Sequence, residues 1–465
     1  MGEYTRRMDL KITLDLWDWT KGSKTDILDI TNDVLNFRFQ KSIKTPAGSC
    51  QLAMLPQSTD THILDIVNTM DVIKIFEFGN LKYVGYVHRI SYSGSIGKDG
   101  KPSRQATITA PQFGGLFQTA SIGFGLGTAL GAPEDELASG AADLFKTLRK
   151  GVTDGFSYKE ILTILVDNFK TYLETLAGGT AANFLTYLQE YLDTSTGLTS
   201  TLTPLLPRSF EMYSGTEQTL TFWQVAEQLV QKPFNEFWID NGPRTVFIDG
   251  KNVELPEKSC FVFRETPFDG TVEGVSDQSF TNMDPIHIDK DHLLKFDLAR
   301  SMDEVYSVYS VKEAAFKLDD ITRILLGLWE VDETRVGKYL FKPLISELFY
   351  TRVEKLDETA IDEQTAAFES AGTNAAQTLR AWFENNDNYL SGVLTHMVPT
   401  DPALDPKIGN KISVYGIEGF FYVEGIAHTW TYGASLQSNL TVTRGWNREK
   451  RIEMKDRIFR RNRLQ

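Results

Sequence analysis

Apolar residues recur at every second position in two separated stretches of the chain, which is the spacing of half-buried β-strands. In the later stretch, 410–446, the pattern predicts a strand, a glycine turn, a long strand and a closing strand, at 411–415, 418–419, 420–432 and 440–444. The earlier stretch, 71–110, has the same order of elements, at 72–78, 79–80, 81–92 and 105–110. Each stretch is therefore predicted to form a β-meander.

The two stretches also share residues. Tyr83-Val84-Gly85, with His88 three residues later, resembles Tyr422-Val423-Glu424-Gly425, with His428 three residues later, if one residue is inserted after the valine. This match predicts that Gly85 is equivalent to Gly425 and that His88 is equivalent to His428. One such match could arise by chance, because turns and glycines are generic features of meanders.

A second match in the same order favours duplication. Leu35-Asn36-Phe37-Arg38-Phe39 precedes Ser42 as Leu294-Lys295-Phe296-Asp297-Leu298 precedes Ser301, with the same spacing. Phe37 and Phe296 are therefore predicted to be equivalent core positions. Two related antiparallel modules in one chain follow from this repeat, the second of them split by an insertion.

The fold class predicted is α+β, mainly antiparallel β, with two related tube-like modules, each a barrel or a sandwich, helical insertions and a small α/β unit between them. In that unit Thr221 is predicted to cap a helix over 222–231, and strands 236–239 and 245–248 are predicted to form a hairpin. The predicted divisions are a first β-module, a helical insertion, the α/β unit, a second β-module with its own helical insertion near 355–392, and a basic tail, at 1–115, 116–203, 204–271, 272–446 and 447–465.

Composition narrows the functional classes. The chain has 465 residues and a formal net charge of -14, which disfavours specific nucleic-acid binding, because such binding needs a basic footprint. Its two cysteines stand singly in strand-like runs and indicate buried thiols. No signal peptide and no apolar run long enough to span a bilayer are visible, so neither secretion nor membrane insertion is predicted.

No catalytic, cofactor or metal signature stands out. Gly123, Gly125 and Gly127 are not followed by the Lys and Ser or Thr of a phosphate-binding loop. His287 and His292 are five residues apart, so on a strand they would lie on opposite faces. We therefore predict no enzymatic activity, no cofactor and no metal, and we interpret His88 and His428 as polar residues fixed on strands.

The chain ends in a basic run that contains Arg457, Arg460, Arg461 and Arg463. One interpretation is a solvated helix whose acidic residues pair with basic ones three or four positions away. The other is a docking peptide for an acidic neighbour. Truncation after Trp446 is expected to spare the fold.

The order of elements from Leu10 to Trp446 resembles the baseplate hub proteins of contractile-tailed phages and related injection systems. The features that carry the resemblance are the two β-modules, the helical insertion, the unit over 222–248, the segment 263–269 and the final strands 419–425 and 440–446. The resemblance implies a homotrimer whose six modules form a pseudo-sixfold ring that starts the tail tube. No spike-like repeat follows Trp446, so a separate spike chain is expected.

The partners that the resemblance implies are a hexameric tail tube protein, a trimeric spike protein and baseplate wedge proteins, and a tape-measure protein is a further candidate. The implied location is the baseplate of a virion or tail-like particle that is assembled in a bacterial cytoplasm. If the modules line a channel, part of the acidic excess is expected to face it. The alternatives are a tail-tip cell-wall hydrolase and a carbohydrate- or receptor-binding tail protein, the latter suggested by the 12% aromatic content.

Overall fold

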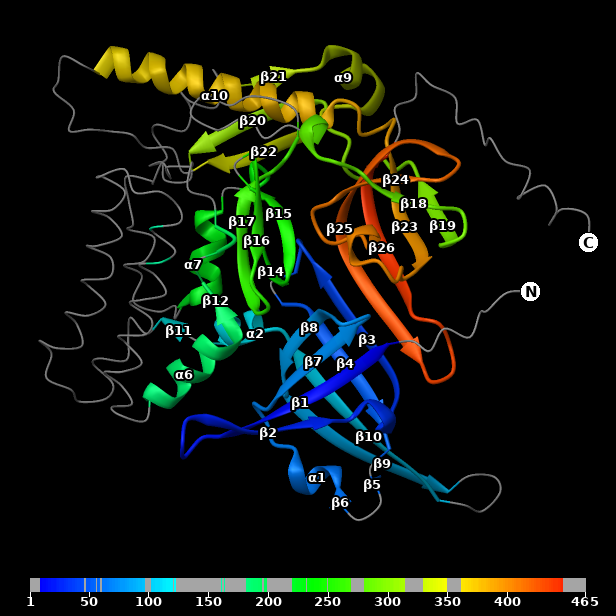
Figure 1. The fold of residues 1–465 in the computed structure, drawn as a ribbon. Helices are drawn as coiled ribbons and strands as arrows, with labels where there is room; N and C mark the ends of the chain where they lie inside the picture. Colours follow the sequence, from blue (N-terminus) through cyan, green and yellow to red (C-terminus); the bar gives the residue numbers. More distant parts are fainter. Residues whose placement is uncertain are drawn as a thin grey trace, which may run out of the picture.

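The structure is a computed structural model, and its elements are shown in Figure 1. The residues it describes are 9–45, 47–55, 57–58, 61–96, 102–119, 121–122, 160, 163, 181–194, 196–198, 220–230, 232–248, 250–268, 280–313, 329–348 and 361–445. Among these, antiparallel strand pairing predominates and each sheet is open, so the predicted mainly antiparallel α+β class is confirmed. No helix in the described part is long and apolar enough to cross a membrane.

The first group of strands, which we call the first module, forms two layers. Its strands are β1 (Leu10–Asp18), β2 (Ser23–Asp29), β3 (Val34–Ser42), β4 (Ser49–Met54), β7 (Val72–Glu77), β8 (Asn80–Tyr86), β9 (Arg89–Ile96) and β10 (Pro102–Pro111). One layer is the sheet β2-β1-β7-β8, and the other is the run β3-β4-β10-β9 of a larger sheet. Short elements at the edges are β5 (Gln57–Ser58), β6 (Thr61–His62) and α1 (Ile63–Ile66).

Alternating apolar side chains fill the space between these layers. Ile12 and Ile75 from one layer share a buried cluster with Phe37, Leu52 and Ile108 from the other. Burial alternates along β3, where Phe37 and Phe39 are buried and the residue between them lies on the outer face. The first module is therefore a sandwich.

The second group of strands, which we call the second module, repeats part of this plan. Its strands are β18 (Ile286–Ile288), β19 (Leu293–Ala299), β23 (Leu390–Met397), β24 (Lys411–Val414), β25 (Ile417–Thr431) and β26 (Gln437–Gly445). The order β19-β23-β26-β25 matches β3-β4-β10-β9, and the hairpin β24-β25 matches β7-β8. The single strand β25 thus corresponds to both β8 and β9 of the first module. One difference is that β18 pairs parallel with β24, whereas β1 pairs antiparallel with β7.

Strand register fixes which residues correspond. In the first module one row of facing residues crosses four strands, from β3 to β9: Phe37, Leu52, Ile108 and Ile90. In the second module the row at the same place, from β19 to β25, is Phe296, Leu394, Leu440 and Ile426. The two modules are therefore alike in strand order and in register.

A middle unit lies between the modules in sequence and packs on both. Its elements are β12 (Leu192–Asp193), β13 (Leu220–Thr221), α7 (Phe222–Leu229), β14 (Asn235–Asn241), β15 (Arg244–Ile248), β16 (Lys251–Leu255) and β17 (Ser259–Glu265). Trp238 of β14 and Val246 of β15 share a buried cluster with Leu394 and Leu440 of the second module. The middle unit therefore covers the second module's sheet, much as β1 and β7 cover the sheet of the first.

The predicted helix of this unit is confirmed, but the predicted hairpin is wrong. Thr221 caps α7 in a capping box with Gln224. Strand β14 pairs with β17, and β15 pairs with β16, so the turn after Asn241 separates two sheets. A Cβ at Gly242 would lie 1.9 Å from the Pro256 carbonyl oxygen, so the chain turns against the end of β16 there.

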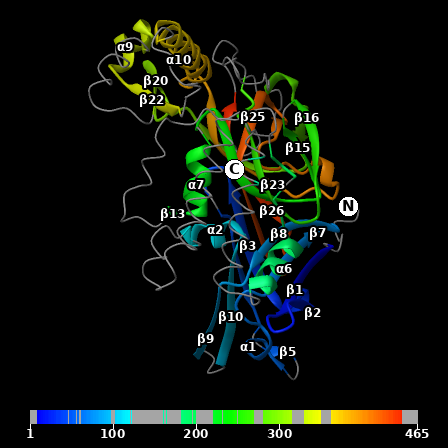
Figure 2. The ribbon, with the colours of Figure 1, turned by 90° about the vertical axis from the view of Figure 1, so that its left-hand side faces the viewer.

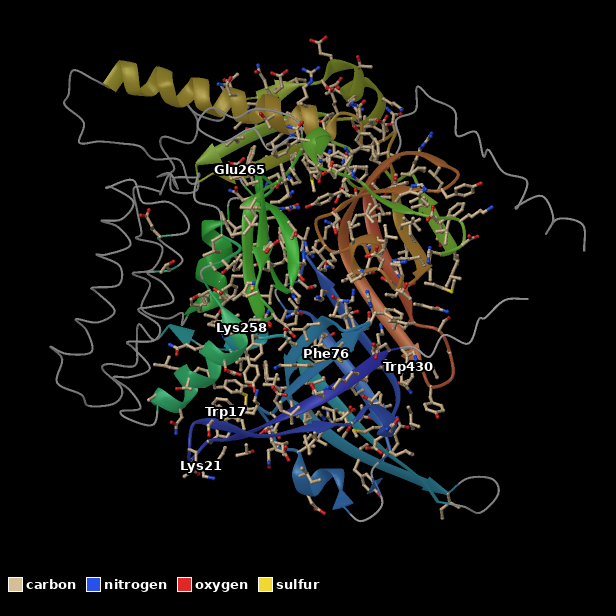
Figure 3. The ribbon with its side chains drawn as sticks, in the orientation of Figure 1. Trp17, Lys21, Phe76, Lys258, Glu265 and Trp430 are labelled. Carbon is tan, nitrogen blue, oxygen red and sulfur yellow. The ribbon has the colours of Figure 1, made fainter. Side chains whose placement is uncertain are left out.

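Helices pack on the outer side of the first module and the middle unit. They include α2 (Gly114–Thr119) and α6 (Ala181–Tyr191), with the short β11 (Ser121–Ile122) nearby. Trp17 of β1 packs on Tyr187 and Tyr191 of α6, with ring centroids 5.1 and 6.0 Å away (Figure 3). Residues 123–159 and 164–180 of the predicted helical insertion lie outside the described residues.

A further unit projects from the end of the molecule near the second module (Figure 2). It contains β20 (Val308–Glu313), β21 (Trp329–Val331), α9 (Glu333–Tyr339), β22 (Pro343–Leu348) and α10 (Ile361–Phe383). Ala376 and Leu379 of α10 pack on Tyr309 of β20 and on Phe234 of the middle unit. Of this unit, α10 lies within 355–392, the range of the predicted helical insertion.

Candidate functional site at the junction of the modules

The two modules are joined by direct strand pairing, which makes one ten-stranded sheet. Strand β3 of the first module pairs antiparallel with β25 of the second, from Asn36 opposite Thr431 to Ser42 opposite Gly425. We call this contact the seam. Trp430, labelled in Figure 3, stacks on Phe37 with ring centroids 5.8 Å apart. The seam therefore has both a hydrogen-bonded ladder and an aromatic contact.

Two buried polar pairs cross from one module to the other beside the seam. The Glu77 carboxylate lies 3.1 Å from His428 Nδ1, and the His428 ring stacks on Phe39 at 4.6 Å. Lys82 Nζ donates to Asp405 Oδ2 at 2.5 Å. These four polar residues are buried, so each of them has lost hydrating water. In its place each has a polar partner on the other module.

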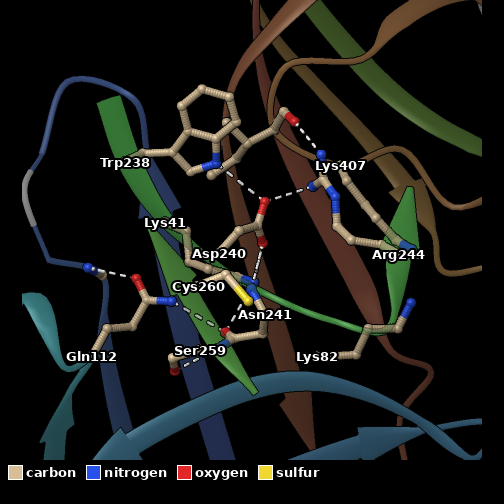
Figure 4. A network of polar contacts seen from close by, with 12 residues as sticks. Lys41, Lys82, Gln112, Trp238, Asp240, Asn241, Arg244, Ser259, Cys260 and Lys407 are labelled. Carbon is tan, nitrogen blue, oxygen red and sulfur yellow. Dashed lines mark hydrogen bonds and ion pairs between the residues drawn. The ribbon is translucent and has the colours of Figure 1, made fainter. Parts of the chain in front are cut away.

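A larger network, shown in Figure 4, is centred on Asp240 at the end of β14. Trp238 Nε1 donates to Asp240 Oδ2 at 3.1 Å, and Arg244 Nη1 lies 2.7 Å from the same oxygen. Lys41 Nζ, from β3 of the seam, lies 3.3 Å from Asp240 Oδ1. Arg244 also donates to the Ile408 carbonyl of the second module at 2.8 Å. Asp240 thus links the middle unit to both modules.

The neighbouring Asn241 extends the network into the first module. Gln112 Nε2 donates to Asn241 Oδ1 at 3.1 Å, and the Gly48 amide donates to Gln112 Oε1 at 2.9 Å. Asn241 Nδ2 donates to Ser259 Oγ at 2.9 Å. This amide therefore holds the ends of β14 and β17 against the chain that enters β4.

A second buried group ties the middle unit to the second module. Arg264 Nε donates to Glu236 Oε2 at 3.1 Å, and Arg264 Nη2 donates to the Gly409 carbonyl at 3.0 Å. The same nitrogen donates to Tyr422 OH at 2.7 Å, and Tyr422 lies 2.6 Å from Glu236 Oε1. A Cβ at Gly409 would lie 2.5 Å from Arg264 Nη2, so glycine is needed for this close approach.

Burial and neighbouring charge set the protonation of these groups. Burial alone would raise the pKa of Asp240, but the charges of Arg244 and Lys41 outweigh it and lower that pKa to about 2. Burial raises the pKa of Glu236 despite the opposing charge of Arg264. Burial, with the charges of Arg244 and Lys82, lowers the pKa of Lys407 to about 8. Asp240 is therefore ionised at neutral pH.

The buried polar contacts join the two modules and the middle unit to one another. Lys41, Arg244, Arg264 and Lys82 each contact a carboxylate on a different element, and the contacts of these groups hold three units together. No set of three His, Cys, Asp or Glu side chains in the described part of the chain is placed to hold a metal ion. These charged groups are placed to bind one another.

The structure places the two predicted core phenylalanines in corresponding rows, but with different burial. Phe37 is 2% exposed, whereas Phe296 is only partly buried against the second module's core. The difference arises because β3 has strands on both sides, whereas among the described residues β19 pairs with β23 alone.

The predicted equivalences of the glycines and histidines do not follow the register. Ile90 and Ile426 occupy the same row position, so the counterpart of His428 is Tyr92. His88 is exposed, whereas His428 is buried. Gly85 pairs with β7, whereas Gly425 pairs with β26 and with β3 of the seam. The register thus places the two histidines four residues out of step, a larger offset than the single residue inserted in the sequence match.

The four arginines of the predicted docking tail, Arg457, Arg460, Arg461 and Arg463, lie outside the described residues, as does 123–131. The network residues were not predicted from the sequence. One signal was available, because Asp240 and Asn241 directly follow an apolar strand. Their partners Lys41 and Gln112 lie more than a hundred residues away, so the sequence did not point to them.

No protein-family profile and no curated protein matches the chain. Among solved structures, it is similar to a tail protein from Neisseria meningitidis MC58, with TM-score 0.45, 11% identity, and 94% of this chain and 96% of that chain covered. It is also similar to the 43 kDa tail protein of prophage MuSo2 from Shewanella oneidensis, with TM-score 0.46, 11% identity, and coverage of 93% and 98%. A third similar structure is from the phage P2 virion baseplate in its activated conformation, with TM-score 0.30, 10% identity, and coverage of 94% and 98%. These similar structures are phage tail and baseplate proteins.

Proposed function

We propose that this chain is a structural baseplate hub of a phage tail or a related injection system. In this role three copies form a ring that joins a hexameric tail tube to a trimeric central spike. The observation that carries the proposal is the repeat within the chain, in which two modules of the same strand order and register are joined edge to edge at the seam. Three such chains present six similar surfaces, while their unlike parts keep threefold symmetry.

The seam supports a load-transmitting structural role. Its strand ladder is flanked by the Glu77–His428 and Lys82–Asp405 contacts and by the network around Asp240. Removing one member of a buried ion pair typically costs about 3–5 kcal/mol because the other charge is left unpaired, so arrangements of the modules that separate these partners are disfavoured. A fixed angle between modules is what a symmetry adapter needs.

The proposed divisions of the chain follow the sequence repeat: modules at 1–115 and 272–446, a helical insertion at 116–203, the α/β unit at 204–271 and a tail at 447–465. The middle unit packs on both modules and so belongs to the same rigid core. We propose that wedge proteins contact the parts that differ between modules, among them the unit of β20–β22 and α10. The role is proposed to be non-enzymatic, without a cofactor.

The experiment is co-expression of the chain with the tube and spike proteins encoded beside its gene. Native mass spectrometry should find three chains of 52.5 kDa bound to three spike chains, and electron microscopy should find tube rings stacked on that complex. A chain that binds neither protein, or that binds in a ratio other than three, would contradict the hub function. Clearing of cell walls in a zymogram would instead favour a hydrolase.

A further inference from the structure

The ten-stranded sheet ends in two strands that each have one neighbour among the described residues. At one end β19 pairs with β23, and at the other end β9 pairs with β10. The outer edge of such a strand offers backbone donors and acceptors to another strand. Both edges belong to the sheet that runs through the two modules.

The seam shows how these two kinds of edge fit together. By register, β19 corresponds to β3, and β9 corresponds to the part of β25 that follows Ile426. Within the chain, β3 pairs antiparallel with that part of β25. The seam thus pairs β3 with β25, whereas the corresponding strands, β19 and β9, remain at the two ends of the sheet.

We propose that β9 of one chain pairs antiparallel with β19 of the next copy, in the register of the seam. This proposal rests on the proposed function, because it names the contact between neighbouring chains of the hub. A contact between unlike edges is head-to-tail, and it closes into a ring when the rotation between copies allows it.

The seam register can be carried over residue by residue. Ile426 faces Lys41 at the seam, and these correspond to Ile90 and Arg300. The pairs expected between copies are Ile90 with Arg300, Ser91 with Ala299, Tyr92 with Leu298, Ser93 with Asp297, Gly94 with Phe296 and Ser95 with Lys295.

The side chains suit this register. Tyr92 is 42% exposed on β9 and would lie opposite Leu298 of the next copy. Ile96 and Leu294 are 79% and 46% exposed, and they fall opposite each other when the Tyr432–Leu35 contact of the seam is carried over. In these two pairs apolar residues meet apolar residues, whereas Ile90 would lie opposite Arg300. A slip of one residue would turn every one of them to the other face.

The alternation of hydrogen bonds selects a pair for cross-linking. At the seam the Tyr432 amide donates to the Leu35 carbonyl, and the Ile43 amide donates to the Glu424 carbonyl. Ala427 and Gln40 therefore form one of the intervening pairs without such bonds, in which side chains are closer. The corresponding pair between copies is Ser91 with Ala299, and both side chains lie outside the core.

The experiment uses the full chain with Ser91→Cys and Ala299→Cys, oxidised in solution and run on a non-reducing gel. Cβ atoms of facing residues are about 4.5–5.5 Å apart, within the adjustment that a disulfide needs. We expect covalent dimers and trimers that disappear on reduction. Burial raises the pKa of the thiols of Cys50 and Cys260, so these native cysteines should not react.

The matched control is Ser91→Cys with Arg300→Cys, which shifts one partner by a residue to the opposite face of β19. Abundant cross-linking of the Ala299 pair with little of the Arg300 pair supports the proposal. Equal cross-linking of both pairs, cross-linking of the Arg300 pair alone, or a monomeric chain that forms no cross-link would overturn it.

A charge exchange tests the same contact without cysteine. Ser93→Asp would place a carboxylate opposite Asp297 of the next copy and should weaken self-association several-fold in analytical ultracentrifugation. Adding Asp297→Lys should restore it. Failure of both results, in a chain that still assembles with tube and spike, would reject this strand contact and leave the hub function standing.

Discussion

At the scale of single residues, one buried carboxylate does much to fix the arrangement of the units. Asp240 contacts Trp238 and Arg244 of its own unit and Lys41 of the seam. Its pKa of about 2 means that it is ionised throughout the neutral range, so both cations keep their counter-charge. An ion pair of this kind fixes geometry more than it adds stability, because desolvation offsets much of the attraction.

The first prediction compares the two corresponding phenylalanines. Phe37→Ala removes a side chain that is 2% exposed and should lower the free energy of unfolding by about 3–5 kcal/mol. Phe296→Ala removes a partly buried side chain on an edge strand, so its cost should be smaller. Chemical denaturation would measure both, and co-assembly with the tube should be lost for Phe37→Ala. If Phe37→Ala matched the parent in stability, the core assigned here would be wrong.

The second prediction concerns acid. Burial, opposed by the charge of Asp405, lowers the pKa of His396 to about 4 from 6.5. The unfolded chain therefore binds this proton more readily, and stability should fall by about 3 kcal/mol as the pH drops from about 6.5 to about 4. His396→Gln should reduce that loss in denaturation curves across this range.

Other charges act on His396, so the variant must be compared with the parent. The charges of His428 and His292 also act on His396. The control is His88→Gln, which removes an exposed imidazole. An unchanged acid response in His396→Gln would mean that other groups set the pH dependence.

At the scale of elements, local signals predicted structure well, and distant pairing did not follow from them. Thr221 and the apolar face behind it sufficed for α7, because a helix satisfies its own hydrogen bonds. The hairpin at 236–248 was predicted wrongly, because β14 and β15 find their partners in later strands. The match of Phe37 with Phe296 follows the register, whereas the match of the histidines departs from it by four residues.

The third prediction tests how β19 is held. Gly392 of β23 has φ +153°, and a Cβ there would lie 2.1 Å from the Asp297 carbonyl oxygen of β19. Gly392→Ala should push β19 away from β23. We expect a large loss of self-association with only a small fall in the melting temperature. The matched control is Gly433→Ala, at φ +82° with no atom within 4 Å of the added Cβ, which should cost about 1–2 kcal/mol through backbone strain alone. Equal loss of association in both variants would contradict a special role for Gly392.

At the scale of the whole molecule, the outer face of the ten-stranded sheet differs from the acidic surface expected of a channel wall. Two of its rows cross from one module to the other through the seam. One is Met397, Gln437, Thr429, Arg38, Gln51, Thr109 and Arg89. The other is Lys295, Thr395, Asn439, Ala427, Gln40, Ser49 and Pro111. Hydroxyl and amide groups predominate and neither row has a carboxylate, although the chain carries a net charge of -14.

The fourth prediction is that this face lines the channel of the proposed ring. The charges of these two rows are those of Arg38, Arg89 and Lys295, so most of the wall would be neutral hydroxyl and amide groups that a polymer can pass without being held by charge. Gln51→Cys lies in the middle of the face, and Ile27→Cys lies on β2 of the other sheet, where the residue is 51% exposed. A bulky polymer-linked maleimide should label both variants in the free chain. In particles closed by tube and spike, it should label only Ile27→Cys, because the bulky reagent cannot enter the channel. Equal labelling of Gln51→Cys in particle and free chain would place this face outside the channel, and the wall would then have to be sought on another surface.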